Sequence, residues 1–350
     1  MGKKLLVLSK VALLLLAFTC VNSAMGQSLR PDSLMFKVEQ LGDYLLYRNH
    51  DTSYIKNYSE NFTLKLIGVN KYNFFKVKDS NLKSSARYRP DRKVNLGFGM
   101  SYKWFAFDLA FNVGIGEDSN FENSKFLDIS GTIFSSKQFI NATYQYYYGY
   151  QMSKLTGINS EDIPDSPTRD DIRTFYFGLQ YYFVFDYDKF SLKASFIHNE
   201  VQRKSAGSFL LGVGFGFYNI GADSTIIPTE FHNDFDESLH FTDLNASILG
   251  VGFGYIYTLV WKKHFYATVS LIPGIGINFG DYKTDYRKPY DTHLYLGFKT
   301  MNSIGYNSKK YFGGFQFTSD FFRTKIEKQL NIQTGHGKAK VFFGYRFSRH

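Results

Sequence analysis

Isolated charged residues that could bind a solute stand at alternate positions within otherwise apolar segments. Asp108, for example, lies between Phe107 and Leu109. If these segments are strands, such residues share the face opposite the large apolar side chains. Charges held inside a protein must be paired, so they predict either structural ion pairs or a polar path or binding cavity for a small solute. The candidates are Asp108, Asp128 and Asp320 with Lys65, Lys193, Lys299, Lys340 and Arg346.

Catalysis has one candidate, a histidine with a serine nearby in the sequence. The parity of His198 predicts a position on the lipid side near an outer rim, where Ser205 or Ser208 could serve as nucleophile for lipid hydrolysis or acyl transfer. Nothing fixes the spacing between them. The sequence has no HExxH, GxSxG, Walker-type, CxxC or EF-hand motif. We therefore favour a binding or structural protein over an enzyme. We assign no catalytic, metal-binding or cofactor-binding residue.

The segments that carry these residues have a strict period of two. From Val94 to Tyr102, even positions hold large apolar or aromatic residues and odd positions hold Asn, Gly or Ser. Side chains alternate between the two faces of a strand, so each segment has one apolar face. Gly-x-Gly repeats, such as the one beginning at Gly212, follow the same period and predict close packing inside a wall rather than nucleotide binding. The pattern recurs over 105–115, 175–183, 209–217, 249–259, 265–279 and 341–347.

Such strands fit a secreted sandwich with the apolar face inside or an outer-membrane barrel with that face toward lipid. The opposite face is dominated by small residues, which is typical of a lumen and not of a solvated surface. Segments of about 10 to 14 residues suit a tilted membrane crossing, which needs about 9 to 11. Aromatic residues make up 19% of the chain, and the tyrosines at 144, 146, 148 and 150 predict a girdle at the headgroups. We therefore expect an all-β, transmembrane, antiparallel up-and-down β-barrel.

The barrel is expected to have about fourteen strands, with twelve as the alternative. An even count places both termini in the periplasm, and the short breaks at 103–104, 135–138, 186–189, 261–264 and 307–310 are expected on that side. Loops 152–171 and 232–243 then lie on the cell surface, the second only if 224–231 is a strand. The predicted strands are 62–77, 83–103, 105–115, 126–135, 138–150, 174–186, 190–202, 208–219, 224–231, 244–260, 264–279, 291–306, 311–324 and 337–347.

The N-terminus has the pattern of a secretory signal peptide over residues 1–26. Lys3 and Lys4 precede an apolar stretch, and Ala24-Met25-Gly26 forms a small-residue cleavage site. Residues 27–61 are expected to form a periplasmic segment, helical over 34–47 or irregular, before a barrel over residues 62–350. From the signal peptide and the barrel together, we expect the protein in the outer membrane of a Gram-negative cell.

Charge and the last residues indicate the partners. The net charge of +10 is spread without a basic run, so nucleic acid is not expected. Outer-membrane lipid and lipopolysaccharide are expected at the apolar face. The aromatic pattern over 341–347 is typical of the signal read by barrel-assembly machinery, although three residues follow Phe347. A small solute is the further expected partner.

Four stretches of the sequence resemble a known family. They are Asp51-Thr52-Ser53-Tyr54-Ile55, Ala86-Arg87-Tyr88-Arg89-Pro90, Lys125-Phe126-Leu127-Asp128-Ile129, and Lys204-Ser205-Ala206-Gly207-Ser208-Phe209-Leu210-Leu211-Gly212. They are similar to outer-membrane proteins of Bacteroidota grouped as domain-of-unknown-function family 4421. The resemblance covers nearly the whole chain after the signal peptide. It implies an outer-membrane barrel and transfers no substrate or catalytic residue.

Overall fold

The computed structural model describes residues 50–90, 94–102, 105–113, 124–158 and 167–347. By its internal contacts the chain divides into Met1–Tyr47 and Arg48–His350. The predicted signal peptide and the predicted helix over 34–47 therefore lie outside the described residues. No helix in the described part of the chain is long and apolar enough to cross a membrane.

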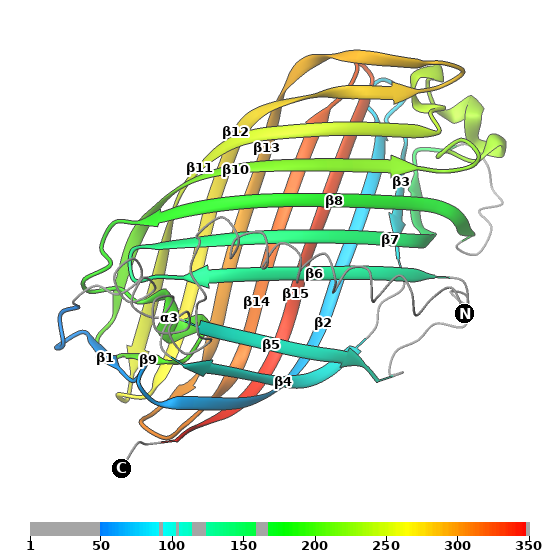
Figure 1. Ribbon diagram of the computed structural model, residues 1–350. Coiled ribbons are helices and arrows are strands. Elements are labelled where there is room, and N and C mark those ends of the chain that lie inside the picture. The colour runs from blue at the N-terminus through cyan, green and yellow to red at the C-terminus, as the bar shows by residue number, and fades with distance from the viewer. Residues whose placement is uncertain (1–49, 91–93, 103–104, 114–123, 159–166, 348–350) are drawn as a thin grey trace, which may run out of the picture. The chain divides into compact units, whose positions relative to one another are not determined.

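Antiparallel strands make up most of the second unit (Figure 1), and thirteen of them belong to one sheet. They are β2 (Phe62–Asp79), β3 (Ser85–Arg89), β4 (Val94–Tyr102), β5 (Phe105–Asn112), β6 (Lys125–Phe134), β7 (Gln138–Thr156), β8 (Thr168–Val184), β10 (Ala206–Gly221), β11 (Asp243–Trp261), β12 (Phe265–Lys283), β13 (Arg287–Asn307), β14 (Tyr311–Lys325) and β15 (Leu330–Phe347). The smaller elements are β1 (Ile55–Asn57), α3 (Leu192–Phe196), β9 (Glu200–Gln202) and the 3-10 helices η2 (Thr229–Asp234) and η3 (Glu237–Leu239).

The sheet closes into a barrel through β2. This strand pairs along its whole length with β15, and its last part, Phe75 to Lys78, pairs with β3, which pairs in turn with the end of β7. The closed ring has ten strands: β2, β3, β7, β8, β10, β11, β12, β13, β14 and β15. Three further strands extend the sheet beyond this ring. β4 and β5 continue it from β2, and β6 continues it from β7.

A seam separates β5 from β6. In the described part of the chain β5 pairs with β4 alone and β6 pairs with β7 alone, so each has one edge without a strand partner. Both faces of β6 contain exposed side chains, including Leu127 and Ile129 on one face and Phe126 on the other. We call this boundary the β5–β6 seam.

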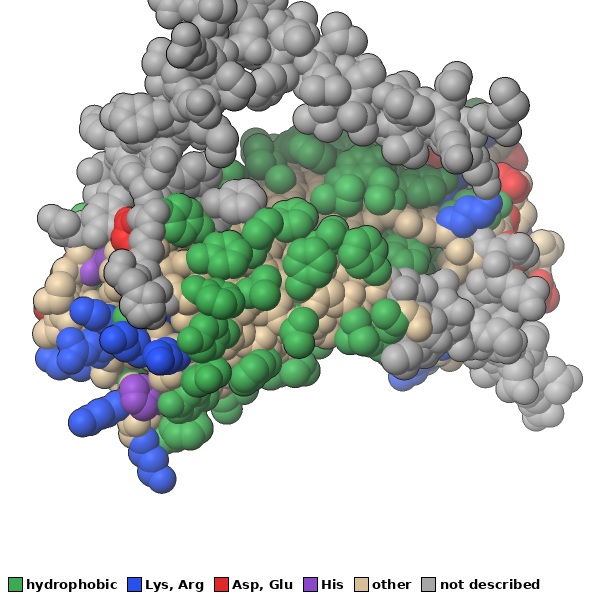
Figure 2. Space-filling model, turned by 60° about the horizontal axis from the view of Figure 1, so that its bottom comes forward, with side chains coloured by type: hydrophobic (Ala, Val, Ile, Leu, Met, Phe, Trp, Pro, Cys, Tyr) green, Lys and Arg blue, Asp and Glu red, His purple; other side chains and the backbone are tan. Residues whose placement is uncertain are grey.

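The outer face of the barrel is an apolar belt. Val251 and Leu271 are 53% and 61% exposed, and the same parity holds large exposed apolar residues on strands around the ring. Figure 2 shows part of this belt, with lysines and arginines gathered at one end of the face. The period of two therefore places apolar side chains outside, as the sequence predicts. Proteins that face water rarely expose a continuous apolar surface of this kind.

Inside, tyrosine rings lie over glycines of the neighbouring strand. A Cβ atom on Gly212 would come within 2.4 Å of the Tyr182 ring, so that ring can pack on the wall only because residue 212 has no side chain. Gly149 has a φ of +85°, a conformation that favours glycine, and it marks a bulge in β7. The bulge reverses the faces that follow, so Tyr150 is buried inside rather than exposed in the predicted girdle.

The predicted count of fourteen strands is not found. Residues 190–202 form α3 and the short strand β9 instead of a wall strand, and residues 224–231 run into η2 instead of forming a strand. Predicted strand 83–103 is divided into β3 and β4, which pair with different parts of the sheet. Proline at position 90 cannot donate a ladder hydrogen bond, which is consistent with β3 ending at Arg89.

Segments folded against the lumen wall fill both ends of the barrel (Figure 1). At the end that contains the short turns 135–137, 262–264 and 308–310, the plug (residues 186–205) includes α3 and β9, and β1 pairs with β9. Leu192 and Phe196 of the plug pack with Ile256 of β11. At the opposite end, the cap (residues 222–242) packs Phe231 and Leu239 into the largest apolar cluster. We call these ends the turn end and the loop end.

Candidate functional site

The predicted acids of the lumen lie in three separate ion-pair clusters. Asp108 of β5 accepts from two lysines on β2 and β15, strands that pair with each other. Its Oδ1 is 2.8 Å from Lys65 Nζ on β2, and its Oδ2 is 3.0 Å from Lys340 Nζ on β15. One carboxylate therefore bridges two lysines across the turn-side half of the lumen.

Asp128 of β6 is the centre of the second cluster. Its Oδ1 lies 3.0 Å from Lys71 Nζ, and its Oδ2 accepts hydrogen bonds from Gln145 Nε2 and Tyr147 OH at 2.9 and 2.6 Å. Lys71 also donates to the Asp128 backbone carbonyl at 2.7 Å. Because Lys71 belongs to β2, this contact connects the two sides of the β5–β6 seam through side chains.

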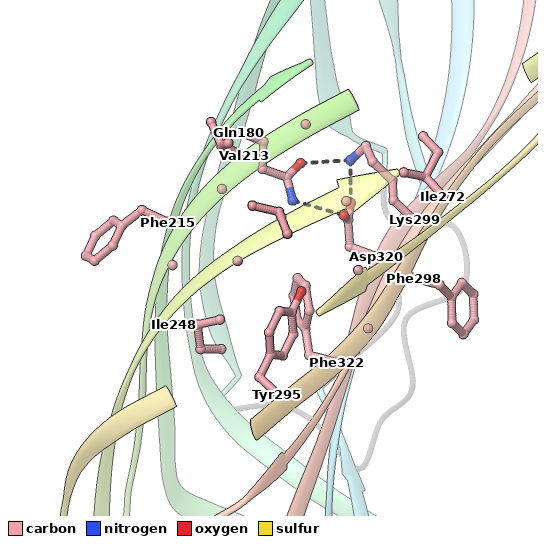
Figure 3. A pocket seen from close by; sticks show the side chains of 18 of the residues that line it. Gln180, Val213, Phe215, Ile248, Ile272, Tyr295, Phe298, Lys299, Asp320 and Phe322 are labelled. Carbon is pink, nitrogen blue, oxygen red and sulfur yellow. Dashed lines mark hydrogen bonds and ion pairs between the residues drawn. The ribbon is translucent and has the colours of Figure 1, made fainter. Parts of the chain in front are cut away.

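Asp320 of β14 forms the third cluster with Lys299 and Gln180 (Figure 3). Lys299 Nζ is 2.8 Å from Asp320 Oδ2 and donates to Gln180 Oε1 at 3.0 Å, while Gln180 Nε2 donates to Asp320 Oδ1 at 3.1 Å. His336 Nε2 lies 3.9 Å from the same carboxylate. Asp320, Lys299 and Gln180 line a cavity of about 50 Å³ together with Tyr295 and several glycines. That volume suits a few water molecules.

Two predicted lumen bases lie at the turn end and bind the plug. Lys193 belongs to helix α3 and not to a wall strand, and its Nζ is 3.7 Å from Glu200 Oε1. Ser191 begins that helix by accepting a hydrogen bond from Ala194 N. The prediction of Lys193 on a strand was wrong. Residues 192–196 form a helix in which every residue is buried, so the sequence alternation there does not reflect the two faces of a strand.

Arg346 of β15 connects the barrel wall to the plug. Its Nε donates to the His198 carbonyl at 2.7 Å, its Nη2 donates to Asn307 Oδ1 at 2.5 Å, and its Nη1 donates to the Ser308 carbonyl. The guanidinium also lies over the ring of Phe312. Arg346 thus holds backbone and turn groups and does not take part in the three acid clusters.

The structure does not assemble the catalytic arrangement considered for His198. This residue is buried inside the barrel, stacked on Phe312, with Nε2 3.1 Å from Tyr266 OH. Burial and nearby lysines hold its pKa well below the usual range. Ser205 Oγ instead accepts from Val260 N at 2.9 Å, and Ser208 Oγ accepts from Asp186 N at 2.9 Å. The predicted lipid-facing position of His198 is therefore wrong.

Sequence reasoning missed a second histidine cluster, which joins His50 to the plug. His50 Nε2 lies 3.3 Å from Glu200 Oε1 and 3.2 Å from Ser136 Oγ, and His50 Nδ1 lies 2.9 Å from the Tyr187 carbonyl. A Ser-His-acid triad needs the acid and the serine on opposite ring nitrogens, but here both contact Nε2. The members come from three distant segments, so no local motif could have revealed them.

The charges of His50 and Glu200 support each other. Burial disfavours the charged histidine, but the hydrogen bond and charge of Glu200 outweigh it and raise the pKa of His50. For Glu200, burial is likewise outweighed by His50, Lys193 and Ser191, and its pKa is lowered. This is a tether between the segment before β1 and the plug.

Two lumen lysines were also missed, although their parity could have revealed them. Lys71 has the parity of Lys65 on β2, and Lys338 has the parity of Lys340 on β15. Lys71 contacts Asp128 across the β5–β6 seam, and Lys338 stands opposite Lys71 in the β15–β2 register. Of the two, Lys71 is paired with Asp128, whereas Lys338 has no ion-pair partner among the described residues.

Three solved structures resemble this chain, each at a low TM-score. The outer membrane protease OmpT from Escherichia coli has a TM-score of 0.35 at 8% identity, with 85% of this chain and 100% of that chain covered. OprG from Pseudomonas aeruginosa has a TM-score of 0.25 at 10% identity, covering 85% and 100%. The toluene transporter TodX of P. putida has a TM-score of 0.25 at 9% identity, covering 87% and 95%. Likenesses this weak assign no activity.

Family membership is established by sequence. No curated protein matches the chain. The model of one family matches residues 49–347, which include every described strand and all three acid clusters. The chain belongs to the family described as a domain of unknown function (DUF4421).

Proposed function

We propose that this protein is an integral outer-membrane β-barrel that binds a small polar solute in an occluded lumen. The observation that supports it is the contrast between the two faces of the wall. Val213 and Leu211 of β10 are about half exposed on the outside, whereas the lumen holds the clusters of Asp108, Asp128 and Asp320. An apolar belt outside and polar groups inside is the pattern of a barrel in lipid.

The filled ends favour binding over free passage. At the turn end, Gln316 donates to the Ser195 carbonyl at 2.8 Å and Asn307 donates to the Ala194 carbonyl at 2.9 Å, which fixes the plug to the wall. At the loop end, Tyr88 OH donates to the Ile226 carbonyl at 2.7 Å. A solute crossing between the two ends would have to displace these contacts.

A structural or adhesive barrel is the second candidate. Its support is that Asp108, Asp128 and Asp320 each already have a lysine partner, as ion pairs that brace a wall would have. Under either function the belt would contact outer-membrane lipid and lipopolysaccharide. β15, which closes the ring on β2, would be the strand read by barrel-assembly machinery.

Conductance in planar bilayers tests the occluded lumen. We expect the wild-type protein to give almost no steady current, because plug and cap both remain in place. A variant in which residues 190–202 are replaced by a short Gly-Ser linker should open to resolvable steps, since its lumen loses α3 and β9. Steady porin-like conductance of the wild type would contradict the occlusion. A variant that stays silent would show that the plug is not the barrier.

A further inference from the structure

Four lysines gather on the lumen face of β2 and β15. We call Lys65, Lys71, Lys338 and Lys340 the lysine cluster; β2 and β15 pair directly. Two acids accompany the cluster, since Asp108 binds Lys65 and Lys340 and Asp128 binds Lys71. The third lumen acid, Asp320, is 2.8 Å from Lys299. The lysine cluster therefore has two positive charges more than its acids neutralise.

Lys338 is the member of the lysine cluster that has no acid partner among the described residues. It stands directly opposite Lys71 in the β15–β2 register, and both side chains have lumen parity. Like charges directly opposite each other in a sheet are destabilising. Among the described residues, Lys338 has no hydrogen-bond or ion-pair partner, whereas the other three lysines are paired. A lysine kept at this cost to the fold points to an anion that binds there.

The β5–β6 seam gives this cluster a route to the outside. Neither β5 nor β6 has a strand partner on the seam side in the described chain. The Lys71 and Asp108 side chains are 27% and 32% exposed, whereas the Lys65 side chain is 4% exposed. As far as the described residues extend, an anion could therefore approach the cluster from the seam side without passing either the plug or the cap.

We propose that the lysine cluster binds a phosphate group, supplied either by a free solute or by a lipid headgroup. This inference names the ligand of the proposed binding function and rests on it. A phosphate monoester carries a charge of about −1.5 to −2 at pH 7, which matches the two excess positive charges. Its oxygens can accept from several ammonium groups at once, and lysine is a common phosphate binder. Binding would replace the Lys71–Lys338 repulsion with two attractions.

Calorimetry on the full-length protein in a neutral maltoside detergent tests the site with two probes, inorganic phosphate and short-chain phosphatidic acid. We expect Lys338→Gln to weaken binding by about ten- to a hundred-fold, the usual effect of losing one charge-assisted hydrogen bond. Lys338→Arg should restore most of the affinity. The matched control is Lys76→Gln, because Lys76 lies on β2 but on the outer face, and it should bind as the wild type does.

The two probes distinguish the source of the phosphate. Binding of phosphatidic acid alone assigns the site to a lipid headgroup that enters through the seam, and binding of inorganic phosphate alone assigns it to a free solute. Binding of neither probe overturns the proposal, and so does unchanged affinity in Lys338→Gln. In each case, retained heat-modifiability on gels shows that the barrel itself is folded, so the proposed membrane barrel survives such a failure.

Thermal unfolding gives a second measurement that does not depend on affinity alone. Without phosphate, Lys338→Gln should unfold at a higher temperature than the wild type, because the like-charge contact is gone. Phosphate should raise the midpoint of the wild type more than that of the variant. A variant that is less stable than the wild type without phosphate would mean that Lys338 supports the fold, and this would count against the site.

Discussion

Arg346 is the residue whose loss should damage the fold most, because it is buried and donates to three groups around the plug. Arg346→Met should lower the free energy of unfolding by about 2–4 kcal/mol, since it leaves the carbonyls of His198 and Ser308 without their donor. Urea unfolding followed by the gel shift of the folded barrel measures this. Arg346→Lys should recover part of the loss, because a single ammonium cannot serve all three acceptors.

The matched control for Arg346 is Arg323→Met on β14. Arg323 has outer parity and is exposed, so its substitution should change the free energy of unfolding by less than about 0.5 kcal/mol. Equal losses of unfolding free energy in the two variants would mean that Arg346 stabilises the fold only through its positive charge and not through its three hydrogen bonds.

The His50–Glu200 pair predicts a pH-dependent stability. The raised pKa of His50 gives stability that is complete below the ordinary value of 6.5 and is lost as pH rises through the folded pKa. The lowered pKa of Glu200 gives stability that is complete above the ordinary value of 4.5 and is lost as pH falls through the folded pKa. The pair therefore contributes fully between about pH 4.5 and 6.5.

Urea unfolding of the wild type and of His50→Gln at pH 5.5 and pH 8.5 measures this contribution. The stability difference between the two proteins should shrink at pH 8.5. His264→Gln is the control, because His264 lies in an exposed turn. A difference that stays constant with pH would show that His50 acts through packing and not through charge.

Parity explains which single residues could be predicted. Asp108, Asp128, Asp320 and Lys299 stand on regular wall strands, where each residue's face follows from its position. Arg346 also follows parity, but its partners come from the plug and could not be inferred. Which lysine pairs with which acid depends on contacts between strands 21 to 232 residues apart, which periodicity does not encode.

At the scale of elements, two wrong strand predictions cancel. Each of the predicted strands 190–202 and 224–231 would have carried the chain across the wall once more. Two extra crossings return the chain to the same end of the barrel. The structure has neither, so β8 and β10 remain antiparallel neighbours, and so do β10 and β11. The end of β7, the start of β8 and the cap therefore share one end of the barrel, as the longer count also required.

The reason for the errors is physical. In 190–202 the apolar residues alternate over a short stretch, which is equally compatible with a buried helix turn followed by a bend. In 224–231, Pro228 precedes η2 and suits its start better than the middle of a strand. Long strands such as β11 and β12 could be predicted because the period persists far longer than in either of these segments.

Cysteine labelling of intact cells tests the placement of the cap. Asn233→Cys and Glu237→Cys, both exposed in residues 222–242, should react with a membrane-impermeant maleimide. Lys309→Cys, exposed in the turn 308–310, should react only after the outer membrane is broken. The expected side follows from the rule that short turns lie in the periplasm. The reverse labelling pattern would mean that the barrel has the opposite orientation.

At the scale of the barrel, the way in which the sheet closes was the property that the sequence predicted least well. The period of two predicts a wall with an outside and an inside, and the structure confirms an all-β antiparallel barrel. It does not predict that β2 pairs first with β4 and then with β3, because that branching depends on where the ladder from β7 meets β2. The β5–β6 seam is a consequence of the branching, so it too emerged only in three dimensions.

The central claim is that the apolar belt faces lipid, and a spin label at Val251 tests it most directly. Val251 lies in the middle of β11 and is 53% exposed on the outer face. With the only cysteine, Cys20, replaced by serine, Val251→Cys and Lys309→Cys would be labelled and reconstituted into liposomes. We predict that the label at Val251 collides with oxygen, which enters bilayers, far more than with a water-soluble nickel chelate, and that the label at Lys309 shows the opposite preference. Equal access of the nickel chelate to both labels would contradict the membrane barrel.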